Sequence, residues 1–116
     1  MRKSLFILLM CIGFTASAND MSQLETVNKA LTGDYQTQRN LAFSYSNGWG
    51  AKGDVDFFPK SPIHACAWRK IILLTNTDKI DDNDYSNESI DCKNVHPTEN
   101  KDVWSLVFGI LQKMNK

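Results

Sequence analysis

The segment that decides the fold reads GDYQTQRNLAFSYSNGWG at positions 33–50, then a loop, then PIHACAW at positions 62–68. Gly33 ends one helical segment, and Asp34 can cap the next because a carboxylate accepts backbone N–H groups of a first turn. Leu41 and Tyr45 share one face at helical spacing. A second, apolar helix follows from about Pro62, since proline suits the first turn of a helix. The segment therefore predicts a helical hairpin.

A repeat-like pattern runs through this hairpin, carried by Gln38, Leu41, Tyr45, Gly48 and Gly50 in the first helix and turn, and by Ala65 and Trp68 in the second helix. With these residues the segment resembles a Sel1-like repeat, a relative of the tetratricopeptide helical hairpins. Two departures are a longer segment between Gly50 and Ala65, and an Ile-Ile-Leu run in place of the family's usual Lys-Ala-Ala. The resemblance implies a single hairpin over about residues 33–75 and a role in protein interaction, because such repeats are not enzymes as a rule.

Residues 1–18 have the features of a secretory signal peptide. Arg2 and Lys3 give a charged start, an apolar run follows, and Ala-Ser-Ala at positions 16–18 is a small-residue cleavage signal. The apolar run is too short to span a membrane. A lipoprotein signal would use Cys11, but Met10 stands where a small residue is wanted. We expect a periplasmic or secreted protein with one helical domain, residues 19–116, and no membrane span after cleavage.

The charge of the mature chain is close to neutral. The full sequence has 13 basic and 13 acidic residues, so losing Arg2 and Lys3 leaves a slight acidic excess. Sequence-independent binding to nucleic acid requires a basic surface, and this composition does not provide one. We therefore expect a protein partner and no nucleic acid.

The mature chain keeps two of the three cysteines, Cys66 and Cys92. An even number of cysteines in an oxidising compartment predicts one disulfide. In the chain-entropy model, closing a loop of this length stabilises the fold by about 3–4 kcal/mol. We expect a structural role for the bridge.

Helical periodicity predicts four helices besides the first helix of the hairpin. They are Met21–Thr32, His64–Thr75 as the second helix of the hairpin, a helix from Asp81 or Asp82 to about Cys92, and roughly Thr98–Met114. The second of these is apolar on nearly every side, so we expect it at the centre. The last has an apolar stripe broader than one face needs, so it either docks in a deep groove or meets a partner. The predicted fold is all-α: a compact four- or five-helix domain around one hairpin, with one disulfide.

The acidic run at residues 78–91 invites a calcium hypothesis. Counted from Asp82, however, the sixth position of a calcium loop is Asn87 and the twelfth is Lys93, where glycine and glutamate are required. Helix capping and a solvated surface explain the run better.

The two histidines offer an enzyme alternative. His64 and His96, with Cys66 and Cys92, would make a zinc set, but residues two apart on a helix point in different directions and the compartment favours oxidised thiols. No sequence feature pairs either histidine with a nucleophile or an orienting acid. A small metal-dependent or hydrolytic enzyme using His64 and His96 remains the alternative, and we expect no catalytic residue, metal or cofactor.

The irregular segment 49–63 is the sharpest candidate for partner binding. It holds Trp49, Phe57, Phe58 and Lys60, and aromatic and basic side chains are typical interface anchors. The other reading is that Phe57 and Phe58 plug the open end of the hairpin. The preferred function is an exported, non-enzymatic protein-protein interaction module, with an immunity or inhibitor protein against a secreted hydrolase as its specific form.

Overall fold

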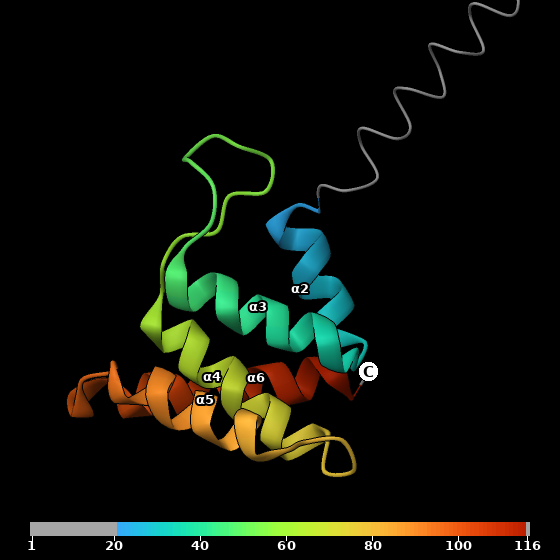
Figure 1. Ribbon diagram of the computed structural model, residues 1–116, viewed down its shortest axis with the longest axis vertical. Coiled ribbons are helices and arrows are strands. Elements are labelled where there is room, and N and C mark those ends of the chain that lie inside the picture. The colour runs from blue at the N-terminus through green and yellow to red at the C-terminus, as the bar shows by residue number, and fades with distance from the viewer. Residues whose placement is uncertain (1–20, 116) are drawn as a thin grey trace, which may run out of the picture.

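The computed structural model describes residues 21–115, and the predicted signal peptide lies outside them. The described chain folds into α2 (Gln23–Leu31), α3 (Tyr35–Asn47), α4 (Pro62–Thr75), α5 (Asp82–Lys93), a 3₁₀ helix (Pro97–Glu99) and α6 (Asn100–Met114). An isolated antiparallel bridge between Trp49 and Phe58 is the only strand-like pairing in this part of the chain. The predicted all-α fold of four or five helices with one disulfide is confirmed (Figure 1).

The predicted hairpin is formed by α3 and α4. The backbone N–H of Ser61 donates to the carbonyl of Tyr45 at 2.8 Å, which holds the start of α4 against the end of α3. At the other end, Asn76 after α4 donates to Gln38 near the start of α3. The two helices are therefore antiparallel. Their facing surfaces bury a common apolar core with Leu41, Ala42 and Tyr45 from α3 and Ala65, Trp68, Ile71 and Ile72 from α4.

Local signals in the sequence set the ends of these helices. Gly33 has a φ of 98°, a left-handed conformation that suits glycine between α2 and α3. Asp34 caps α3 by accepting from the side-chain hydroxyl and the backbone N–H of Thr37, and these two hydrogen bonds lower the pKa of the Asp34 carboxyl. Ser61 caps α4, with Pro62 in its first turn. The predicted starts of both helices follow from these caps.

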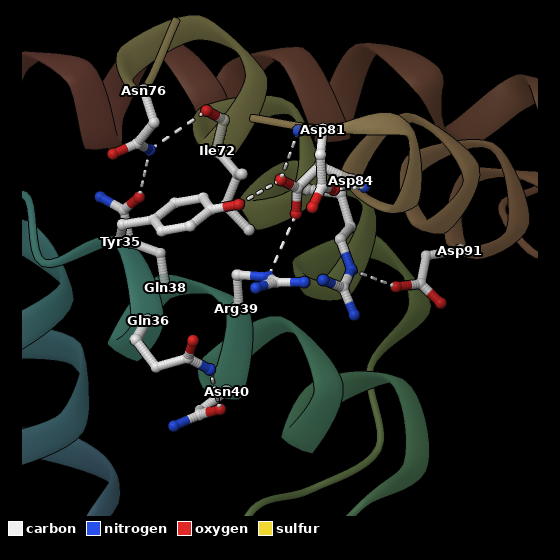
Figure 2. A network of polar contacts seen from close by, with 11 residues as sticks. Tyr35, Gln36, Gln38, Arg39, Asn40, Ile72, Asn76, Asp81, Asp84 and Asp91 are labelled. Atoms are coloured by element: carbon white, nitrogen blue, oxygen red, sulfur yellow. Dashed lines mark hydrogen bonds and ion pairs between the residues drawn. The ribbon is translucent and has the colours of Figure 1, made fainter. Parts of the chain in front are cut away.

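A polar link crosses the buried side of the hairpin. Gln38 is fully buried and donates from Nε2 to the carbonyl of Ala30 at 3.0 Å, while its Oε1 accepts from Asn76 Nδ2 at 2.8 Å. Asn76 also donates to the carbonyl of Ile72 (Figure 2). A buried amide must be hydrogen-bonded to avoid a desolvation cost, and both amides are bonded here. The link fixes the end of α2 and the end of α4 to α3.

The remaining helices pack around the hairpin. α2 contacts α3, and α6 contacts α4, burying Val103 and Val107. α5 lies against α4 and is joined to it by the predicted disulfide, Cys66–Cys92. Among the described helices, none is long and apolar enough to cross a membrane. α4 thus has helices on several sides, as its apolar sequence predicts.

Part of the acidic run at residues 78–91 is buried, whereas the sequence predicted a solvated surface. Asp81 caps α5 in a capping box with Asp84, as expected. Asp84 and Asp91, however, are buried and pair with cations. The reason is that α5 lies on arginines of α3 and α4, which are distant in sequence and gave no local signal.

Candidate functional site

One concavity of the described chain lies where α2 and α3 meet the loop of residues 48–61. We call it the aromatic cleft. Its volume is about 520 Å³, within the usual range for a binding pocket. In Figure 1 the loop projects from the bundle on the same side as α2. The cleft is lined by Met21, Thr26, Lys29, Thr37, Asn40, Phe43, Ser44, Trp49, Asp56 and Phe58.

Two aromatic side chains of the cleft are open to solvent. Phe43 of α3 is 55% exposed and Trp49 of the loop is 56% exposed. Phe43 lies off the helix face that carries Leu41 and Tyr45 into the core, so the helical register itself turns its ring outward. Large aromatic side chains bury much apolar area when a partner covers them, so both are candidate contact residues.

Trp49 is held in place although it is exposed. Its backbone N–H donates to the carbonyl of Phe58 at 3.0 Å, and the N–H of Phe58 donates back at 2.8 Å. The indole Nε1–H donates to Asp56 Oδ2 at 2.9 Å. Gly48 precedes Trp49 with a φ of 75°, which lets the chain leave α3 sharply. The ring is therefore presented in a defined orientation.

Phe58 forms the floor of the cleft. It is 5% exposed and packs edge-to-face on Tyr45, with ring centroids 5.5 Å apart. Tyr45 in turn accepts a hydrogen bond from Gln23 of α2 at 2.9 Å. Phe58 therefore has the packing role, one of the two readings that the sequence left open.

The other two predicted partner residues lie apart from this floor. Phe57 is half-buried, and Lys60 is exposed. Lys60 lines a second, more polar cavity of about 410 Å³ beside Ser46 and Asp91. The structure thus brings together Trp49 and Phe58 but not all four residues.

Phe43 was not among the residues that the sequence analysis selected. It sits between Leu41 and Tyr45, the two residues that the sequence analysis placed on one helix face. On a helical wheel, Phe43 falls outside the stripe that Leu41 and Tyr45 share. This offset is the signal that could have identified Phe43 as an outward-facing residue.

The polar side chains of the cleft are a mixture of hydroxyl, amide and charged groups. Asn40 accepts from Gln36 through its Oδ1, and Thr37 donates to Asp34. Lys29 stands at the α2 wall and Asp56 at the loop wall. Charges of both signs at the rim suit a protein surface, where polar groups surround an apolar centre.

His64 has a packing environment. Its ring lies 4.9 Å from the Tyr45 ring, and its Nδ1 is 2.7 Å from the Ser61 hydroxyl. Partial burial lowers the pKa of His64, because an apolar setting disfavours the charged imidazolium. These contacts join His64 to the helix cap.

His96 caps the 3₁₀ helix, with its Nδ1 accepting from the backbone N–H of Thr98 at 3.2 Å. The disulfide removes the thiols of Cys66 and Cys92 from the hypothetical zinc set. Within residues 21–115, no group of His, Cys, Asp and Glu side chains is placed to hold a metal ion. The geometry therefore does not bring the hypothetical zinc set together in these residues.

Comparisons of the chain with protein-family models, with curated proteins and with solved structures found no match. The resemblance to a Sel1-like repeat accordingly stays a prediction, alongside an observed antiparallel hairpin.

Proposed function

We propose that this chain is an exported, non-enzymatic protein-binding module whose partner docks on the aromatic cleft. The observation that carries the proposal is the pair of aromatic rings, Phe43 and Trp49, which line one cleft and are each more than half exposed. Aromatic side chains are enriched among the residues that dominate binding energy at protein interfaces. Their position at a concave surface suits the insertion of a partner's side chain or loop.

Preorganisation of the cleft supports the same function. The Trp49 ring is fixed by Asp56, and the loop that carries it is fastened by the bridge to Phe58. A surface that is ordered before binding loses little conformational entropy when the partner arrives. A rigidly held Trp49 ring therefore favours tight association.

Export and the specific form of the function are parts of the proposal. Export is supported by the signal-like residues 1–18 and by the Cys66–Cys92 disulfide, a kind of bond that persists in oxidising compartments. The specific form is an immunity or inhibitor protein that covers a secreted hydrolase. Small size and a rigid, disulfide-linked scaffold support this form, by analogy of class alone.

The test uses the mature chain, residues 19–116, immobilised and exposed to envelope and secreted proteins of its source. We expect capture of one protein, whose dissociation constant is then measured for wild type and variants. Phe43→Ala should weaken binding by about 30-fold, the effect of losing about 2 kcal/mol at a central aromatic contact. Circular dichroism should show an unchanged fold, because the ring is exposed.

The matched control is Phe108→Ala on α6, whose ring is 60% exposed and does not line the cleft. Its affinity should equal that of wild type. Loss of binding in Phe108→Ala with none in Phe43→Ala would contradict the assignment of the cleft. Absence of any captured protein with a folded wild type would contradict the binding function, and hydrolytic activity in the captured protein would identify the inhibitor form.

A further inference from the structure

Helix α5 lies on the bundle without an apolar face. Its buried residues are Asp84 and Asp91, while its large apolar side chains Tyr85 and Ile90 are exposed. A surface helix is normally held by an apolar stripe that faces the core. Burial of apolar area by the helix itself therefore does not explain why α5 is docked.

Carboxylates of α5 instead meet cations of α3 and α4. Asp91 Oδ2 lies 2.8 Å from Arg69 Nε, and Glu88 Oε2 lies 2.8 Å from Lys70 Nζ. Asp84 Oδ1 lies 3.2 Å from Arg39 Nε. In Figure 2 the side chains of Tyr35 and Arg39 converge on Asp84. The helix thus docks as an acidic segment on a cationic face, made of Arg39, Arg69 and Lys70.

Neutral hydrogen bonds complete this contact only in part. Tyr35 donates its hydroxyl to Asp84 Oδ2, and the hydroxyl of Ser46 donates to Asp91 Oδ1 at 2.8 Å. Asp84 Oδ1 is buried and has no hydrogen bond among the described residues, since Arg39 is near but not aligned for one. Buried ion pairs roughly balance the cost of removing their charges from water. Polar contacts of this kind determine where α5 lies, but they add little net free energy to its attachment.

The disulfide is the strong element of the attachment. It joins Cys92 in the last turns of α5 to Cys66 in α4. Cys66 is buried and Cys92 is only partly buried, so Cys92 Sγ is the sulfur that a reagent reaches first. Apolar anchors near α5 are confined to its flanks, at half-buried Ile80 and buried Val95.

We propose that α5 is a cover over the cationic face of α3 and α4, and that the Cys66–Cys92 bridge controls whether it can open. The reaction needs a dithiol reductant. One thiolate of the reductant attacks Cys92 Sγ, the S–S bond breaks, and Cys66 leaves as a thiolate that takes up a proton. The second reductant thiol then displaces Cys92 as a thiol, so the dithiol is oxidised to a disulfide and the protein gains two electrons and two protons.

Opening exposes charges that are neutralised in the closed form. Arg39 and Arg69 lose their carboxylate partners, while the core between α3 and α4 keeps Leu41, Ile71 and Ile72. The opened face is therefore cationic and fits an acidic protein segment, as α5 itself does. This device is independent of the aromatic cleft, which α5 does not line.

The experiment is hydrogen exchange by mass spectrometry on the mature chain, with and without dithiothreitol. After reduction, amides of residues 82–93 should lose about ten-fold more protection, or more still, than those of residues 35–47 and 62–75, as expected for local opening. Cys66→Ala/Cys92→Ala should reproduce this pattern without reductant. Unchanged exchange in α5, or equal loss of protection in all helices, would overturn the proposal.

A charge variant tests whether the carboxylates guide closure. Asp84→Asn should speed exchange in α5 of the reduced protein by a further several-fold and leave the oxidised protein nearly unchanged, because the bridge then holds the helix. The matched control is Asp102→Asn, an exposed carboxylate on α6. An equal effect of both variants on α5 would also overturn the proposal.

Discussion

Helices α4 and α5 are neighbours in sequence, similar in length and joined by a disulfide, yet different forces hold them. α4 has 14 residues and buries Trp68, Ile71 and Ile72 among others. α5 has 12 residues, and the ones it buries are Asp84 and Asp91. Helical secondary structure is therefore compatible with two quite different attachments to the same core.

The difference shows which interactions define the domain and which are added to it. Burying a large apolar side chain stabilises a fold by about 1.5–3 kcal/mol, and α4 has several such side chains. An exposed or partly exposed ion pair such as Lys70–Glu88 contributes only about 0–1 kcal/mol. α4 belongs to the core through its own sequence, whereas α5 depends on its capping box, its charge partners and the disulfide.

Truncating Trp68 tests whether apolar burial holds α4 in the fold. The side chain is 3% exposed at the centre of the core, so Trp68→Ala should lower the free energy of unfolding by about 3–5 kcal/mol. Urea denaturation followed by circular dichroism measures the change. The control is Trp104→Ala, because Trp104 is 42% exposed and should lose far less. A stable Trp68→Ala protein would contradict the assigned core.

Removing the disulfide tests whether the bridge stabilises the attachment of α5. Cys66→Ala/Cys92→Ala should cost about 3–4 kcal/mol in the chain-entropy model for a sequence separation of 26 residues. Alanine replaces both residues, since a serine hydroxyl at buried Cys66 would add an unpaired polar group. The loss should appear as a lower melting temperature, and wild type in dithiothreitol should match it. An unchanged melting temperature would show that the bridge does not stabilise the fold.

A single carboxylate of α5 should have a smaller effect. Asp91→Asn leaves the buried Arg69 guanidinium without its counter-charge, which should cost about 1.5–3 kcal/mol. The control Asp102→Asn, on the exposed side of α6, should change stability by less than about 0.5 kcal/mol. Urea denaturation of both variants separates the two cases. Equal stability would mean that the Arg69–Asp91 pair carries no net interaction.

Replacing the whole pair sharpens the same test. Arg69→Met/Asp91→Leu removes both charges and fills the space with apolar groups, so much of the loss in Asp91→Asn should be recovered. A double variant less stable than the single one would show that the pair itself, with its hydrogen bond from Ser46, holds α5.

The sequence was sufficient to predict the helices of this fold because their signals are local. Gly33 and Asp34 mark the boundary between α2 and α3, and Pro62 marks the start of α4. The start of α5 was predicted from a cap at Asp81 or Asp82, and Asp81 is the cap. Such signals involve residues within one turn of each other, so they can be identified without the tertiary structure.

The surroundings of the acidic run and of the loop could not be predicted in the same way. Asp91 meets Arg69 across 22 positions, and Asp84 meets Tyr35 across 49, so a local reading assigned both carboxylates to capping or solvent. The inward direction of Phe58 depends on its bridge to Trp49, which brings together the two ends of an irregular loop. Long-range pairing decides burial in both places.

The smallest expected effect is the pH dependence of stability that comes from His64 of α4. Burial lowers the pKa of His64 below its ordinary value of 6.5, so the folded state binds a proton less readily than the unfolded state. Stability from this group is therefore fully present above pH 6.5 and declines as pH falls from that value toward the lower pKa of the folded protein. His64→Gln should flatten the decline in melting temperature over this range.

The measurement is the melting temperature of wild type and of His64→Gln across this range of pH. If His64→Gln keeps the wild-type slope, burial of His64 does not set the decline. The pH profile thus tests whether one partly buried histidine on the core helix contributes to the stability of the fold.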